Sequence, residues 1–139
     1  MHATAAGARI LVVEDDPLIL ELVTTRLGIA GYEVFYARDG VSAMERLTEV
    51  RPKGMILDIN MPRLDGFGVL QKMKSAGLTT SVPTLVLTAR RQPEDVRRAV
   101  ELGAKDFLSK PFDDQQLLAR VARLLRKPAP RAEQPSVLI

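Results

Sequence analysis

Short apolar runs alternate with amphipathic segments along most of the chain. Five runs predict largely buried strands, at residues 9–13, 33–37, 55–58, 82–88 and 105–109. Between and after them, apolar side chains recur at the three- and four-residue spacing of helices that face a core. The inward positions predicted by this spacing are Ile19, Leu22, Val23 and Leu27; Ala43, Met44, Leu47 and Val50; Leu70 and Met73; Val96, Ala99 and Val100; and Leu117, Val121, Leu124 and Leu125.

This alternation predicts an α/β fold. Strand–helix units in strict alternation favour a parallel sheet with helices on both faces, which is a doubly wound, flavodoxin-like arrangement of five strands and five helices. The strand order 2-1-3-4-5 is borrowed from that fold class and does not follow from the residues themselves. One domain is expected over residues 9–127, with a disordered segment at 1–8 and a Pro-rich tail or linker at 128–139.

Composition narrows the chemistry. The chain of 139 residues has no cysteine and a single histidine, His2, so any metal must be held by oxygen ligands. Its apolar runs are far shorter than the roughly 20 residues that span a bilayer, and its start lacks the apolar stretch of a signal peptide. A cytoplasmic protein with no membrane contact is therefore expected.

Polar residues follow four of the predicted strands. Glu14 and Asp15 come after the first strand, Asp58 and Thr88 close the third and fourth, and Lys110 follows the fifth. Carboxyl ends of parallel strands share one edge, where such sheets bind ligands. Each residue alone has an ordinary interpretation, as a solvated loop, a turn, a strand or a surface residue. Their joint placement favours a site.

These residue types indicate phosphoryl chemistry. Three carboxylates in contact repel one another, and a cation such as Mg²⁺ relieves that repulsion. A carboxylate can also act as a nucleophile toward a phosphoryl group, and a lysine can neutralise the phosphoryl oxygens. A hydroxyl such as that of Thr88 could hydrogen-bond one of those oxygens.

The same segments resemble the receiver domains of bacterial two-component response regulators. The resemblance spans about residues 9–127 and is carried by Ile10–Asp16, Ile56–Pro62, Asp65-Gly66, Leu87–Ala89 and Lys110–Phe112. It implies that Asp58 is the phosphoacceptor and that Lys110 pairs with the phosphoryl group. It further implies that Glu14, Asp15, Asp58 and the backbone carbonyl of Asn60 hold Mg²⁺.

The resemblance also implies a switch and its partners. Thr88 would reorient toward the phosphoryl group, and Phe107 stands at the position of the family's switch aromatic. The donor would be a sensor histidine kinase or a phosphotransfer protein. The output would pass through the face made by the fourth helix, fifth strand and fifth helix, to a downstream protein, a C-terminal output domain or a second copy of the chain.

The resemblance implies no enzyme in the usual sense, because such a domain takes part only in its own Mg²⁺-dependent phosphorylation and dephosphorylation. An aspartyl-phosphate hydrolase is the first alternative, but no second acid follows Asp58 as a general acid, and no cap domain is evident. A nucleotide binder is disfavoured because no glycine-rich phosphate loop follows the first strand. Direct binding to nucleic acid is not expected of these residues.

An arginine cluster leaves one further alternative open. Arg90, Arg91, Arg97 and Arg98 could bind an anion such as a cyclic dinucleotide. The simpler interpretation is a solvated helix face, in which Glu94 and Arg98 form an i,i+4 pair. Arg90, two residues after Thr88, is also expected to overhang the acidic site.

Overall fold

The computed structural model describes residues 7–90 and 92–126. Most of the segment expected to be disordered, all of the expected Pro-rich tail and Arg91 lie outside these residues.

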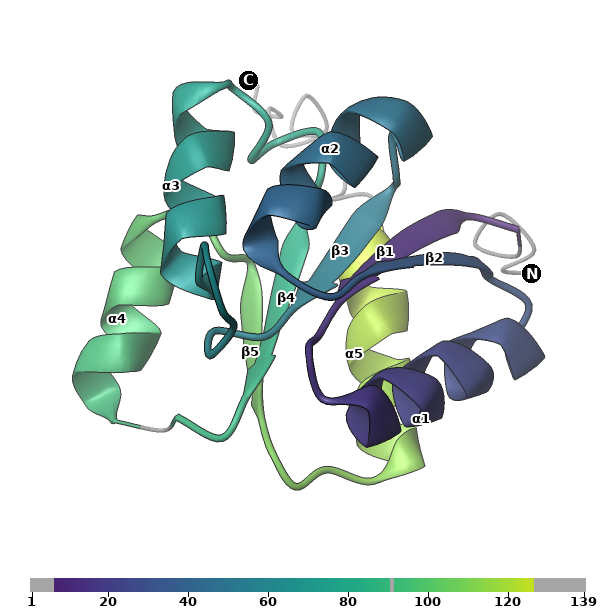
Figure 1. Ribbon diagram of the computed structural model, residues 1–139. Coiled ribbons are helices and arrows are strands. Elements are labelled where there is room, and N and C mark those ends of the chain that lie inside the picture. Colours follow the sequence, from purple (N-terminus) through teal and green to yellow (C-terminus); the bar gives the residue numbers. More distant parts are fainter. Residues whose placement is uncertain (1–6, 91, 127–139) are drawn as a thin grey trace, which may run out of the picture.

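A five-stranded parallel sheet forms the centre of the molecule, and its order β2-β1-β3-β4-β5 confirms the expected topology (Figure 1). The strands are β1 (Arg9–Val13), β2 (Glu33–Ala37), β3 (Gly54–Leu57), β4 (Thr84–Thr88) and β5 (Asp106–Ser109). Every residue of β3 and β4 is buried, as strands covered on both faces must be.

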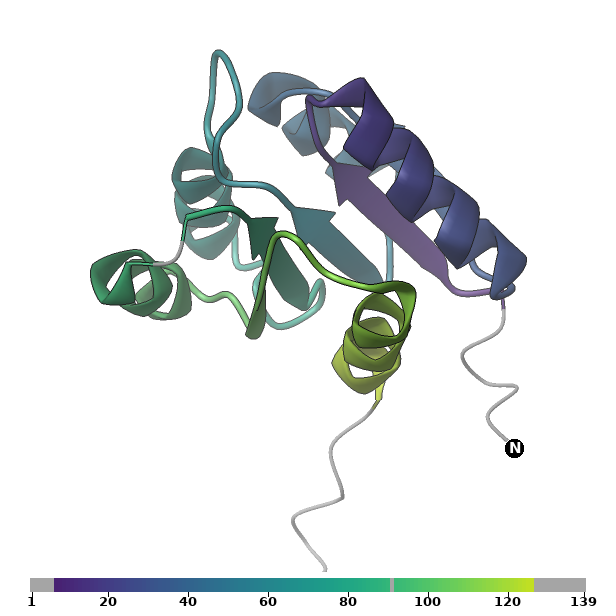
Figure 2. The ribbon, with the colours of Figure 1, turned by 90° about the horizontal axis from the view of Figure 1, so that it is seen from below.

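Five helices cover the two faces of the sheet (Figures 1 and 2). They are α1 (Pro17–Ile29), α2 (Gly40–Val50), α3 (Gly66–Ser75), α4 (Pro93–Glu101) and α5 (Asp114–Leu125). One core cluster joins α1 and α5 to side chains such as Ile10 and Leu85, and the other joins α2, α3 and α4 to their neighbours Leu11 and Val86. Successive strand residues thus face opposite layers.

Aspartates fix where four of the helices begin after the loops. The side chains that accept hydrogen bonds from the first-turn N–H groups are Asp16, Asp39, Asp65 and Asp113. Each cap satisfies donors that the helix itself leaves unpaired. Because the four caps follow β1, β2, β3 and β5, they help to set the loops at the carboxyl edge of the sheet.

The predicted bounds of β3 (55–58) and β5 (105–109) each differ by one residue from the observed strands, so Asp58 lies just beyond β3. Two other predictions about individual elements were wrong by more than this. β4 starts at Thr84 and not at Val82, because Val82 donates its N–H to Leu78 and precedes a proline, which has no N–H for the ladder. Val100 was expected to face inward but is 56% exposed. The buried positions of α4 are Asp95 and Ala99. The spacing of hydrophobic residues did not predict that the carboxylate of Asp95 faces inward.

In the described part of the chain, no helix has both the length and the apolar character needed to cross a membrane.

Candidate functional site

The backbone holds the polar residues at the carboxyl edge of the sheet. The parallel hydrogen-bond ladder continues just past the strand ends, because Asp58 donates its N–H to Val13 at 3.0 Å and Lys110 donates to Thr88 at 2.9 Å. Glu14 donates to Ala37 at 3.1 Å in the same way. These residues are therefore fixed by strand pairing, although they lie one residue beyond the strands or at their ends.

Three carboxylates converge at this edge. Glu14, Asp15 and Asp58 each offer an oxygen atom, and these oxygens lie within 4.8 Å of one another. Glu14 and Asp58 are almost fully buried, at 2% and 5% exposure, while Asp15 is half-buried. A buried set of only oxygen donors fits a hard divalent cation that keeps part of its water shell.

Lys110 supplies the positive charge of the site. Its Nζ lies 2.9 Å from Oε1 of Glu14 and 3.5 Å from Oδ2 of Asp58. Burial by itself lowers the pKa of Lys110, but the hydrogen bond to Glu14 and the charge of Asp58 outweigh it, so the net pKa is raised. The ammonium group therefore stays charged and links two of the three acids.

The carboxyl group of Glu14 has a strongly raised pKa. Its burial raises its pKa, the hydrogen bond from Lys110 opposes this, and the nearby charge of Asp58 raises it again, to about 7 in total. Burial therefore outweighs the hydrogen bond from Lys110, and the ionised form of Glu14 is disfavoured in the absence of a further positive charge.

Thr88 and Phe107 lie where the topology places them. Thr88 is fully buried, and its hydroxyl oxygen accepts a hydrogen bond from the N–H of Arg90 at 3.3 Å. Phe107 is half-buried, pairs with Val86 in the neighbouring strand and packs against the core cluster beneath α2, α3 and α4. The two residues thus lie in adjacent strands, Thr88 at the end of β4 and Phe107 within β5.

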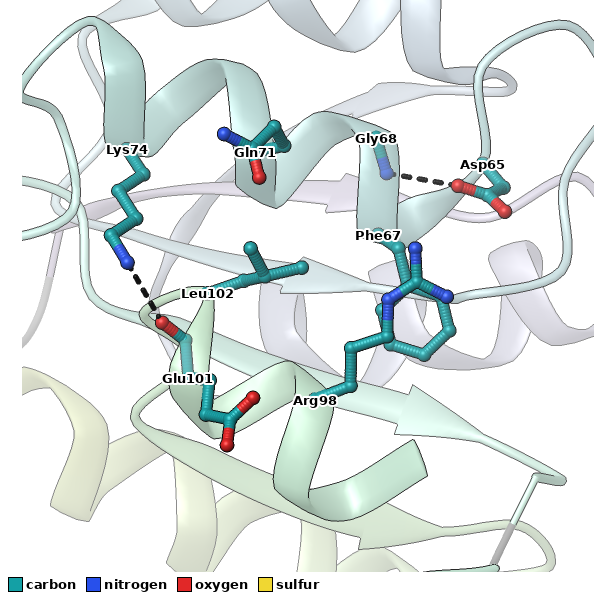
Figure 3. Close-up of a pocket in the computed structure, with 8 residues that line it drawn as sticks. All are labelled: Asp65, Phe67, Gly68, Gln71, Lys74, Arg98, Glu101 and Leu102. Carbon is teal, nitrogen blue, oxygen red and sulfur yellow. Dashed lines mark hydrogen bonds between the residues drawn. The ribbon is translucent and has the colours of Figure 1, made fainter. Parts of the chain in front are cut away.

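The described arginines of the cluster make different contacts, although Arg97 and Arg98 are both exposed. Arg90 does overhang the edge, since it donates to Oδ1 of Asn60 at 3.3 Å and to Oδ1 of Asp95 at 2.8 Å. The guanidinium carbon of Arg98 lies 4.1 Å from the ring centroid of Phe67 (Figure 3). Glu94 is not among the ion-pair partners found in the described residues. Arg97 is exposed.

Sequence reasoning missed the contacts that hold the loop after β3. Arg63, with a left-handed φ of 69°, donates to Oδ2 of Asp39 at 2.6 Å, while Gly40 packs directly against Leu64. A Cβ atom at position 40 would overlap the carbonyl of Leu64. The pair Asp39-Gly40 is a recognisable turn signal, but nothing in the sequence pattern indicates that Arg63 and Leu64 contact it.

Two grooves flank the site without containing the acidic cluster. One, of about 550 Å³, lies between α3 and α4, where Arg98 lies against Phe67 and Lys74 reaches the carbonyl of Glu101 (Figure 3). The other, of about 380 Å³, is mainly apolar and is lined by Ile19, Leu22, Ala89, Lys110, Pro111 and Phe112. Because Lys110 belongs to both the second groove and the acidic site, that groove opens beside Asp58.

Comparison with known proteins identifies the family. The family model of the response regulator receiver domain matches residues 10–122. The chain belongs to this family. As a receiver domain it is a non-enzymatic signalling module of two-component systems, which confirms the expected family and class of protein.

Curated relatives are longer proteins. The chain is 41% identical over 119 residues to the DNA-binding dual master transcriptional regulator RpaA of Synechocystis, covering 86% of this chain and 49% of that protein. It is 42% identical over 129 residues to the response regulator MprA of Mycobacterium avium, covering 93% and 56%. The chain thus spans about half the length of the curated relatives it matches.

Solved receiver domains match over nearly their whole length. The chemotaxis protein CheY4 of Vibrio cholerae superposes with a TM-score of 0.80 at 34% identity, covering 86% of this chain and 100% of that one. The receiver domain of a histidine kinase from Syntrophus aciditrophicus gives 0.78 at 36% identity, covering 89% and 97%.

Proposed function

We propose that the chain is a phosphorylation-dependent switch of a two-component phosphorelay, with Asp58 as the phosphoacceptor. The observation that carries this proposal is the position of the Asp58 carboxylate, buried within an acidic cluster and 3.5 Å from the ammonium of Lys110. A buried acid beside a cation and other acids suits a nucleophile whose product is an anion, because both the nucleophile and the product need compensating charge.

Mg²⁺ is the ion that fits the cluster best. The carboxylates of Glu14, Asp15 and Asp58, with the backbone carbonyl of Asn60, would hold it, since small hard cations take oxygen ligands and need few of them from protein. When bound, the ion supplies positive charge to the phosphoryl oxygens. Burial is the main cause of the raised pKa of Glu14 and the charge of Asp58 adds to it, so a cation at this position would favour the ionised carboxylate.

The chain's own residues have distinct roles in the transfer. An oxygen of Asp58 forms the new bond to phosphorus as the phosphorus–nitrogen bond of a phosphohistidine breaks and its electron pair returns to the imidazole. Lys110 neutralises the phosphoryl oxygens. The Thr88 hydroxyl, which now accepts a hydrogen bond from the backbone N–H of Arg90, donates a hydrogen bond to one of those oxygens, and Phe107 repacks beside β4.

A phosphohistidine donor must contact the surface around Asp58. The apolar groove beside Lys110 and the side chain of Leu18, which is 75% exposed at the start of α1, provide an apolar rim at that position. Because the two reacting groups must come within bonding distance, the donor protein must cover this rim during transfer. We therefore assign it to a histidine kinase or a phosphotransfer protein.

The output surface is the α4–β5–α5 face. Asp106 of β5 is paired there with Arg120 at 3.1 Å and Arg123 at 2.7 Å, and the exposed Val100 adds an apolar contact on α4. A second copy of the chain, a downstream protein or an output domain would bind at this face. The contacts of Arg90 and Arg98 with Asp95 and Phe67 do not favour a cyclic dinucleotide as its ligand.

The decisive experiment is phosphorylation by acetyl phosphate with Mg²⁺, read by intact mass. The wild type should gain one phosphoryl group, and the gain should be lost in Asp58→Asn and in the presence of EDTA. Lys110→Ala should greatly reduce it. Continued modification of Asp58→Asn at the wild-type rate would overturn the proposal. Glu45→Gln, which removes an exposed acid from α2, is the matched control and should be modified like the wild type.

A further inference from the structure

Arg90 connects the candidate site to the first turn of α4. Its Nη1 lies 3.3 Å from Oδ1 of Asn60, in the loop that leaves Asp58, and its Nη2 lies 2.8 Å from Oδ1 of Asp95 in α4. Its backbone N–H also donates to the hydroxyl of Thr88. A single residue therefore touches the loop after β3, the end of β4 and the start of α4.

Asp95 depends on this contact more than Arg90 does. Its side chain is only 12% exposed, whereas that of Arg90 is 40% exposed. Departure of Arg90 would leave a nearly buried carboxylate without its ion-pair partner, which is costly unless the carboxylate gains water or other donors. The first turn of α4 would have to loosen to provide them, and its cap residue, Gln92, makes no side-chain capping hydrogen bond that would resist this.

A second arginine holds the middle of α4 in place. The guanidinium carbons of Arg90 and Arg98 lie 5.4 Å and 4.1 Å from the ring centroid of Phe67, which belongs to α3. Figure 3 shows Arg98 reaching from α4 to this ring. If Arg90 moved away, Arg98 would still join α4 to α3 by a cation–π contact. A rearrangement that begins at Arg90 is therefore confined to the start of the helix.

We infer that Arg90 is a further phosphoryl-binding residue, which exchanges the carboxylate of Asp95 for the oxygens of a phosphoryl group on Asp58, and that Asp95 is the positioning residue that holds it ready. The inference rests on the proposed function of Asp58. A guanidinium binds phosphoryl oxygens through paired donors, and a phosphoryl group of about −1.5 to −2 charges attracts it more strongly than one carboxylate. Thr88 and Arg90 then respond together, because one hydrogen bond already links them.

The test is the affinity of the domain for beryllofluoride, a tetrahedral phosphoryl mimic, titrated calorimetrically in the presence of Mg²⁺. Asp95→Asn removes the competitor and should tighten binding by about fivefold, because it frees Arg90 from its ion-pair partner. Arg90→Gln removes a charge-assisted donor and should weaken binding by about tenfold. If the ion pair were purely structural, both variants would break the same contact, and their affinities would change in the same direction.

The remaining variants separate this inference from the function on which it rests. Arg90→Lys keeps the charge but loses the paired donors, so its affinity should fall between those of wild type and Arg90→Gln. Lys105→Gln, which removes an exposed charge between α4 and β5, should bind as the wild type does. If both Arg90→Gln and Asp95→Asn shift affinity in the same direction, the exchange is wrong while the switch at Asp58 stands. If the wild type itself binds nothing, or Asp58→Asn binds equally well, both are overturned.

Discussion

Without a metal ion, the stability of this fold should fall as pH rises, and Glu14 should be the cause. The folded-state pKa of Glu14 is raised from 4.5 to about 7. A carboxyl group whose pKa is higher in the folded state binds its proton more tightly there than in the unfolded chain. Its stabilising contribution is therefore complete below about pH 4.5 and is lost as pH rises through about 7.

The size of the effect follows from the shift. A difference of 4.5 to about 7, at 1.36 kcal/mol per unit, gives roughly 3 kcal/mol of unfolding free energy lost between pH 5 and pH 8. Little discount for solvent is needed, because the Glu14 side chain is only 3% exposed. For a domain of this size the loss amounts to a fall of about 10 °C in the melting temperature.

The perturbation that isolates this effect is Glu14→Gln, which mimics the protonated form at every pH. Urea unfolding of the two proteins in EDTA should give similar free energies at pH 5, and the variant should be the more stable at pH 8 by up to roughly 3 kcal/mol. The pKa of Asp39 is lowered and that of Lys110 is raised, so these groups change the unfolding free energy below and above this pH range, respectively.

Two further measurements test whether Glu14 causes the pH dependence. Adding Mg²⁺ at pH 8 should restore much of the wild-type stability and should do less for the variant, because the ion favours the ionised carboxylate. Glu21→Gln, which removes an exposed acid from α1, should keep the wild-type pH profile. Parallel pH profiles of wild type and Glu14→Gln would show that Glu14 is ionised at pH 5 like an ordinary carboxyl group, and the electrostatic account of the site would fail.

Three other predictions test the fold and the donor surface. Gly40→Ala should destabilise the domain by about 1–3 kcal/mol in urea unfolding, because the new Cβ overlaps Leu64. Gly28→Ala is the control: its Cβ meets nothing within 4 Å, and it should stabilise α1 by up to about 1 kcal/mol. Equal effects of the two substitutions would contradict the packing seen at Gly40. Met73→Ala should cost about 2–5 kcal/mol, since its side chain is fully buried, and a smaller loss would mean that the core collapses around it. Leu18→Asp should slow phosphoryl transfer from a phosphohistidine protein but leave acetyl phosphate reactions unchanged, and equal slowing of both would remove the groove beside α1 from the docking surface.

The layers of the fold were predictable because burial on both faces leaves a clear mark in the sequence. The strands that run through the centre of the sheet are continuous apolar runs, and the polar residue that ends each run lies at the carboxyl edge by topology alone. The meeting of Glu14, Asp58 and Lys110 therefore followed from strand ends and from the expected order of strands. Their distances confirm that the three side chains share one site.

Long-range polar contacts were not predictable from the same pattern. Asp95 faces inward on α4 because Arg90 pairs with it, and hydrophobic spacing gave that place to Val100 instead. Arg63 and Asp39 are 24 positions apart, and neither has a local signal for the other. Such contacts depend on how loops approach one another in space, which the periodicity of individual elements does not record.

The formal charges of the site indicate the direction in which a phosphorylation signal would travel. Glu14, Asp15 and Asp58 against Lys110 give a balance of −2, which one divalent cation brings to zero. Replacing the single charge of Asp58 by a phosphoryl group of about −1.5 to −2 makes the site negative again, by about 0.5 to 1 charge. Arg38 and Arg90 both contact residues of this edge, but Arg38 donates to the neutral carbonyl of Asp15, whereas Arg90 must leave the carboxylate of Asp95. Attraction of Arg38 would therefore leave no buried charge unpaired, while attraction of Arg90 would disturb α4. Under the proposed function, this asymmetry would direct the response toward the α4–β5–α5 face.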